Sequence, residues 1–91
     1  MEQNKDEIEY PISLETALKI VGSLKVKAIK AINSDDNTID KKELDNKILM
    51  YLQEERMLYG GNDYERLSVM DKVVNLYSPI LKKEYLDSLN K

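Results

Sequence analysis

The chain has 91 residues, carries a formal net charge of −3 and contains no cysteine and no histidine. This length suits one small domain. The missing residue types exclude disulfides, cysteine–histidine zinc sites and nucleophiles activated by histidine, and the negative charge argues against duplex DNA as a partner. No stretch reaches ~18 consecutive apolar residues, so no membrane-spanning helix is predicted. Residues 1–9 have no secretory-signal pattern, so a cytoplasmic location is expected.

Residues 1–12 are predicted to form a loose acidic tail, and residues 13–91 a single helical domain. Ser13 is a suitable N-cap for a first helix over about 13–33. The apolar residues that recur there at helical spacing are Leu14, Ala17, Leu18, Val21, Leu24, Ala28 and Ile32. A brief strand-like alternation at 24–28 has no second strand to pair with, so the helix is favoured.

A turn-rich segment separates this helix from a second one over about 40–59. Asp40, followed by Glu43, has the pattern of a capping box at the start of this second helix. Its apolar stripe consists of Leu44, Ile48, Tyr51, Leu52, Leu58 and Tyr59. Gly60 and Gly61 are expected to end the helix with a left-handed C-terminal cap.

Asn62 with Glu65 repeats the capping-box pattern and opens a third helix over about 63–77. The Ser78–Pro79 pair is interpreted as the start of a last helix over about 79–89, because the residue before a proline avoids the α region. This break is favoured over one kinked, continuous helix. Short connections make consecutive helices antiparallel neighbours. The predicted fold class is therefore all-α, a small antiparallel bundle of three or four helices.

Two charged residues, Lys25 and Glu55, fall among the apolar positions of the first and second helices. A salt bridge between them is one interpretation, although their distances from the connecting turn differ by roughly 10 Å along the helix axes. The favoured interpretation is that Gly22 shifts the helix phase and turns Lys25 outward. A third alternative is a functional side chain that faces a cleft or a partner.

Several apolar residues lie away from the predicted stripes. Those assigned to a partner-binding surface are Leu49, Met50, Met57, Val69 and Leu76, with Glu54 as an acidic neighbour. One explanation is that the second helix is central and buried on two sides. The other is a patch that meets another chain, either a basic protein or a second copy. Methionine side chains suit such an adaptable interface.

The predicted function is therefore that of a small acidic binding protein, an adaptor, inhibitor or regulator, which occupies a protein partner's surface without catalysis. The alternative is a nucleotide- or nucleic-acid-binding module, because aromatic faces and lysines bind bases and phosphates. The candidate ligand-binding residues for this alternative are Tyr10, Lys25, Lys27 and Glu55, which would have to gather around one pocket.

Residues 34–43 resemble the second part of an EF-hand loop, with Glu43 at the bidentate twelfth position. Ile32 then takes the first position, where an aspartate normally binds calcium. No metal and no cofactor is therefore predicted. The sequence also has no glycine-rich phosphate loop and no recognisable set of catalytic residues.

Overall fold

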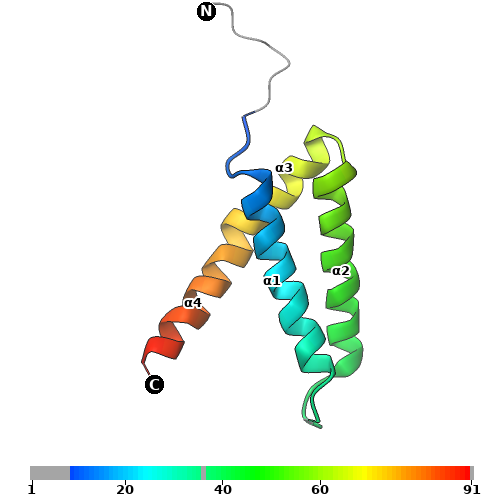
Figure 1. The fold of residues 1–91 in the computed structure, drawn as a ribbon, viewed down its shortest axis with the longest axis vertical. Helices are drawn as coiled ribbons and strands as arrows, with labels where there is room; N and C mark the ends of the chain where they lie inside the picture. The colour runs from blue at the N-terminus through cyan, green and yellow to red at the C-terminus, as the bar shows by residue number, and fades with distance from the viewer. Residues whose placement is uncertain (1–8, 36, 91) are drawn as a thin grey trace, which may run out of the picture.

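The computed structural model describes residues 9–35 and 37–90, and these residues form helices and turns with no strand among them. The elements in chain order are α1 (Leu14–Ile32), α2 (Lys41–Gly60), α3 (Asp63–Lys72), the π-helical segment η1 (Val73–Tyr77) and α4 (Ser78–Leu89). Helices α1 and α2 form an antiparallel hairpin, and α4 diverges from it (Figure 1). The predicted all-α fold class is confirmed. No helix within the described ranges is long and apolar enough to cross a membrane.

The first three helices begin where their capping residues predict. The Ser13 Oγ atom accepts a hydrogen bond from the Thr16 amide at 3.0 Å, and the Asp40 carboxylate accepts one from the Glu43 amide at 3.2 Å. Asn62 caps α3 in a complete capping box with Glu65, through bonds of 2.8 and 3.0 Å. These bonds satisfy amides that a helix start leaves unpaired, so local chemistry determines the start of each of these helices.

The turn between α2 and α3 departs from the predicted left-handed cap. Gly61 has φ −80° and ψ 170°, and neither it nor any other described glycine has a positive φ. A Cβ atom on Gly61 would overlap the Met57 carbonyl oxygen and lie 2.9 Å from a Glu65 carboxylate oxygen, whereas one on Gly60 would meet nothing within 4 Å. Glycine is therefore required at position 61 for space and not for its dihedral freedom.

The junction at Pro79 is continuous, so the predicted break is wrong. The helical backbone passes through η1, and the Ser78 amide bonds to the Val73 carbonyl five residues earlier. Ser78 itself has helical angles of φ −62° and ψ −44°. Proline provides no amide hydrogen, and its ring collides with the carbonyl of the preceding turn. The wider π turn opens the hydrogen-bond ladder just before this position, which lets the helix continue.

The core lies where the hairpin meets α3 and η1. The buried apolar residues are Ala17, Val21, Leu24, Ala28, Tyr51, Leu58, Val69, Met70, Val73 and Tyr77. The α1 members belong to the predicted stripe. Tyr10 and Ile12, which were assigned to the tail, pack against this core, whereas residues 1–8 of the predicted tail lie outside the described residues. Helix α4 contributes no buried residue at all.

Candidate functional site

A buried polar cluster joins the middle of α2 to the end of η1. Glu54 on α2 is buried, with only 6% of the residue exposed. The Tyr77 hydroxyl lies 2.8 and 2.9 Å from the two carboxylate oxygens of Glu54 and donates a hydrogen bond shared between them. The Lys72 ammonium donates to one of these oxygens at 2.7 Å. No buried side-chain nitrogen or oxygen in the described part of the chain lacks a hydrogen-bond partner. The carboxylate is thus stabilised by a cation and a phenol together.

The tyrosine that binds this carboxylate packs against a second tyrosine ring. The rings of Tyr51 and Tyr77 meet edge to face, with centroids 5.7 Å apart and an interplanar angle of 75°. The Lys72 nitrogen lies 5.3 Å from the centre of the Tyr77 ring. Burial, together with the hydrogen bond and the charge of Glu54, raises the pKa of Tyr77 far above its ordinary value of 10.0. Burial also raises the pKa of Tyr51, so both phenols stay protonated at neutral pH and the cluster acts as a structural link.

The predicted position of Glu54 at the edge of an exposed patch is wrong. Glu54 shares one side of α2 with Tyr51 and Leu58, at spacings of three and four residues that bring side chains together on a helix. That spacing was the available signal for its burial. The partners come from α3 and η1, so nothing in the α2 sequence indicated them.

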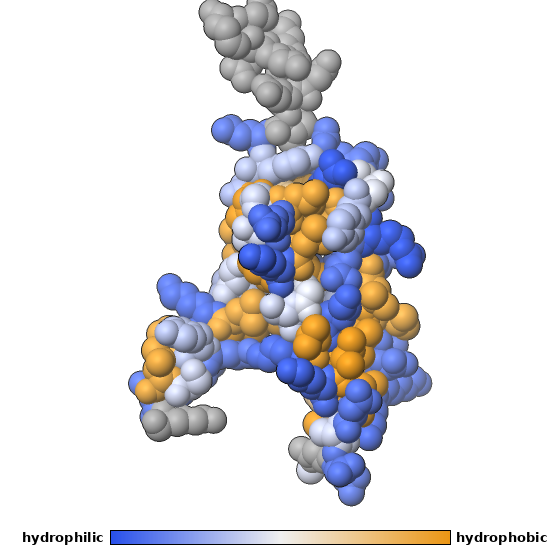
Figure 2. All heavy atoms as spheres, in the orientation of Figure 1, coloured by the Kyte–Doolittle hydropathy of each residue, from blue (hydrophilic) through white to orange (hydrophobic). Residues whose placement is uncertain are grey.

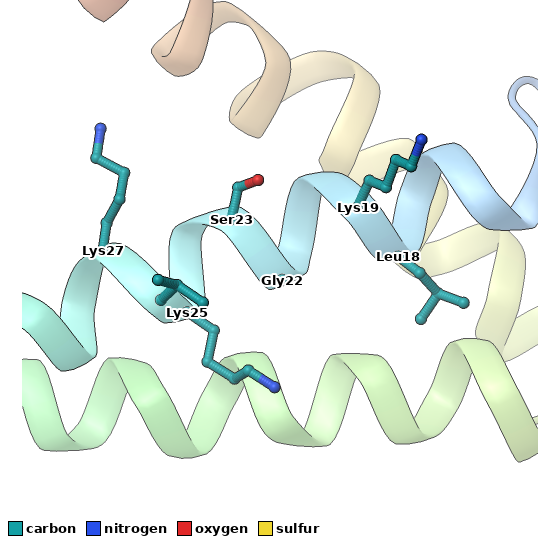
Figure 3. Close-up of a pocket in the computed structure, with 7 residues that line it drawn as sticks. Leu18, Lys19, Gly22, Ser23, Lys25 and Lys27 are labelled. Atoms are coloured by element: carbon teal, nitrogen blue, oxygen red, sulfur yellow. The ribbon is translucent and has the colours of Figure 1, made fainter.

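Lys25 and Glu55 form the salt bridge that was the less favoured interpretation. The two charged groups lie 2.7 Å apart, and their side chains are 24% and 20% exposed. Figure 3 shows Lys25 reaching across to α2 from a regular α1, so Gly22 does not turn it outward. Side chains lean toward the N-terminus of their own helix, so in an antiparallel pair these two lean toward each other. This convergence closes the axial offset expected from the sequence.

The residues assigned to a partner surface do not stay together. Val69 is 3% exposed and belongs to the core, so its predicted surface position is wrong, and Met57 is half-buried against the core. Val69 is covered because α3 packs against α2. On the following segment Met70, Val73 and Tyr77 are buried, whereas Val74 is exposed.

The remaining members, Leu49, Met50 and Leu76, make up what we call the α2–η1 face. These apolar side chains are 60%, 36% and 46% exposed. The Met50 sulfur lies 3.4 Å from the Lys72 ammonium, and Leu76 lies one turn after Lys72. Met50 and Leu76 therefore lie beside Lys72, whose ion pair with buried Glu54 links α2 to the start of η1.

A groove of about 250 Å³ opens between α1, α2 and α4. Its apolar lining consists of Leu24, Ala28, Ala31, Leu44, Tyr51 and Ile80. Lys27, Lys47 and Glu84 line its polar edge, where Lys27 pairs with Glu84 and so connects α1 to α4. Figure 2 shows the molecule hollowed between α4 and the α1–α2 hairpin.

The candidate ligand-binding residues are not gathered around one pocket. The Tyr10 hydroxyl donates to Asp63 at the start of α3. Lys25 and Lys27 lie in the second half of α1, at least roughly 16 Å from its first residue at 1.5 Å per residue. Lys25 is paired with Glu55, and Lys27 with Glu84. A hollow of about 550 Å³ beside these lysines is lined by α1 alone (Figure 3).

Residues 9–35 and 37–90 contain no group of three or more acidic side chains placed to hold a metal ion. Asp36, one oxygen donor of the EF-hand-like segment, lies outside the described residues. Comparison of the chain with protein-family models, with characterised proteins and with solved structures found no match. The function must therefore be argued from the surfaces described above.

Proposed function

We propose that this chain is a non-catalytic binding protein, an adaptor, inhibitor or regulator, that occupies a protein partner's surface through the α2–η1 face. The observation that carries the proposal is the exposure of the apolar side chains of Leu49, Met50 and Leu76. The Lys72–Glu54 ion pair links α2 to the start of η1, the two elements that carry them. Apolar surface left in water costs about 25 cal/mol per Å², so covering it stabilises a complex. A preorganised surface also loses little entropy on binding. The absence of histidine and cysteine supports the non-catalytic part of the proposal.

The partner's contact surface is proposed to be apolar with basic groups around it. Glu54 and Glu55 are engaged inside the molecule, so they do not contribute to this choice. Asp45, one turn before Leu49, and Asp71, beside Lys72, are exposed and carry the acidic charge of this side. Opposite charges across an interface steer association and select the partner.

Affinity capture from the cells that encode the chain tests this proposal. The tagged wild type is compared with Leu49→Asp/Met50→Asp and with the control Val26→Asp/Ile29→Asp, which places the same two charges at exposed apolar positions on α1. The proposal requires one protein that the wild type and the control enrich and that the double variant loses by at least about tenfold. Equal capture by all three, or enrichment of no protein, contradicts it. Circular dichroism confirms that each variant is helical.

A nucleotide site is not favoured as a second function, because Tyr10, Lys25 and Lys27 are paired with carboxylates at separate places. The cytoplasmic location expected from the sequence stays a prediction, which fractionation of the encoding cells tests. Self-association through the same exposed apolar residues, the other use predicted from the sequence, also stays a prediction.

A further inference from the structure

We propose that two copies of this chain pair through the outer faces of their α2 helices, which lie antiparallel across a two-fold axis between residues 50 and 51. What we call the α2 outer face consists of six exposed residues: Lys42, Asp45, Leu49, Leu52, Arg56 and Tyr59. The inference goes beyond the proposed function and does not rest on it. The α2 outer face overlaps the surface described above only at Leu49 and the neighbouring Asp45.

The six side chains of the α2 outer face lie on one side of the helix. They recur at alternating spacings of three and four residues, so at about 100° per residue they project within an arc of about 100°. The buried residues of α2, Tyr51, Glu54 and Leu58, lie on the opposite side. Helix α2 forms one edge of the molecule (Figure 1). The α2 outer face therefore has the spacing of a helix–helix seam and is open to a second helix.

The apolar members of this face have no cover within their own chain. Leu49, Leu52 and Tyr59 are 60%, 41% and 71% exposed. None of the three packs against the core of the described chain. Apolar surface in water costs about 25 cal/mol per Å², so a contact that covers these side chains stabilises association.

The order of residues along the α2 outer face complements its own reverse. An antiparallel pair about the proposed axis sets Leu49 of each copy opposite Leu52 of the other, so four leucines meet at the centre. The next layer outward sets Asp45 opposite Arg56, once on each side of the axis. Neither charge has an ion-pair partner among residues 9–35 and 37–90. Two equivalent salt bridges therefore flank an apolar centre, the usual arrangement of a protein interface.

The charges select this orientation and this register. At each end of the contact, the Lys42 ammonium lies opposite the Tyr59 ring, which attracts cations. A parallel pair would instead set Asp45 against Asp45 and Arg56 against Arg56, which are like charges. An antiparallel pair shifted by seven residues would set a charged side chain against a leucine. The seam therefore has one favourable alignment, as in helix pairs whose charges determine their orientation.

A second copy is the occupant that this face favours, because both halves of every pair are present in one chain. An unrelated helix would have to supply the same apolar pair between an acidic and a basic residue, in the reverse order. The two-fold contact closes as a dimer and leaves no open end. Because the dimer covers Leu49, it competes with the partner proposed for the α2–η1 face.

Sedimentation velocity over a concentration series tests the proposal. The wild type should be a dimer that dissociates on dilution. Leu52→Glu should be a helical monomer, because it places two carboxylates in the apolar centre of the dimer and meets only solvent in the single chain. Leu86→Glu is the matched control on α4, where the leucine is 48% exposed, and it should remain dimeric. A wild type that is monomeric at every concentration, or a Leu52→Glu chain that still dimerises, overturns the proposal.

Charge reversal tests the antiparallel register. Asp45→Arg and Arg56→Asp each place like charges opposite one another twice, and each should raise the dimer Kd by at least roughly tenfold. The combined Asp45→Arg/Arg56→Asp chain should regain wild-type dimerisation. A mixture of the two single variants should form a heterodimer, because each charge of one chain then faces the opposite charge of the other. Charges within one helix cannot produce this result, and a mixture that stays monomeric shows that the proposed pairing is wrong.

The two proposals can fail separately. Met50→Asp/Leu76→Asp changes only the α2–η1 face, so this chain should dimerise like the wild type and lose the captured partner. Leu52→Glu changes only the α2 outer face, so this chain should be monomeric and still capture the partner. Circular dichroism confirms that each variant is helical.

Discussion

The junction of α2 with η1 and the helix α4 are neighbours in the chain, but different forces hold them to the rest of the molecule. At the junction, Tyr77 and Lys72 are bonded to a buried carboxylate, and Val73 and Met70 are fully covered. Helix α4 has one exposed ion pair and the contact of Leu81. Stability is thus concentrated at the junction, and α4 is left available for another molecule.

The largest effect should come from removing the buried carboxylate. Glu54→Ala leaves Lys72 and the Tyr77 hydroxyl without their shared acceptor, and we expect it to lower the free energy of unfolding by about 3 kcal/mol. Glu54→Gln keeps two polar atoms in place and should cost clearly less. Urea unfolding followed by circular dichroism measures both values. A loss below about 1 kcal/mol for the alanine variant would contradict the assignment of stability to the junction.

The turn that brings α3 back onto α2 should be the next most sensitive position. A Cβ at Gly61 overlaps the Met57 carbonyl, whereas one at Gly60 meets open space. We therefore expect Gly61→Ala to destabilise the chain by about 2 kcal/mol, in the range of overpacked sites. Gly60→Ala should change stability by less than about 0.5 kcal/mol. Thermal unfolding of the two variants side by side decides this, and equal melting temperatures would contradict it.

Alkaline pH should weaken the junction selectively. The pKa of Tyr77 is raised in the folded chain above its ordinary value of 10.0, so its contribution to stability is complete below pH 10. Above pH 10 the unfolded chain loses this proton and the folded chain keeps it. Stability should then fall by up to about 1.4 kcal/mol per pH unit for this group. Tyr51, whose pKa is also raised, acts in the same direction.

Tyr77→Phe should reduce this alkaline slope, at the cost of about 1 kcal/mol at neutral pH for the lost hydrogen bond. Tyr64→Phe, at an exposed tyrosine of α3, is the matched control. Urea unfolding at pH 8, 10 and 11 provides the comparison. A slope that Tyr77→Phe leaves unchanged would mean that Tyr77 is not the group whose proton stabilises the fold.

The half-buried pair in the hairpin should have an intermediate effect. Lys25→Met and Glu55→Leu each leave one charge at a position about a fifth to a quarter exposed, and each should cost more than the double change. We expect a coupling energy of about 1 kcal/mol in this double-mutant cycle. Single variants that each change stability by less than about 0.5 kcal/mol would show that the pair contributes as little as a surface ion pair.

The smallest effect should come from the ion pair of α4. Lys27 and Glu84 are both about half exposed, at 53% and 48% of their side chains. We expect Glu84→Gln to change the free energy of unfolding by less than about 0.5 kcal/mol, as for most exposed pairs. A loss comparable to that of Glu54→Ala would show that α4 is held as firmly as the junction, and would remove the basis of the comparison.

Local chemistry made the helix limits predictable from the sequence. Ser13, Asp40 and Asn62 each bond to an amide three residues later, so the information for a helix start lies within one turn. The all-α class and the α1 stripe follow in the same way from residue periodicity. The glycine at position 61 was found, but its role was misread, because spacing does not show which neighbouring atom a Cβ would meet.

The tertiary structure decided which side chains meet across helices. Glu54 is buried, and Glu55 is paired, because α3, η1 and α1 approach α2 from different sides. Val69 is in the core for the same reason, and a π-helical segment carries the chain into α4 before Pro79. Crossing angles and the path of η1 depend on the packing of the whole chain, and periodicity within one helix contains no information about them.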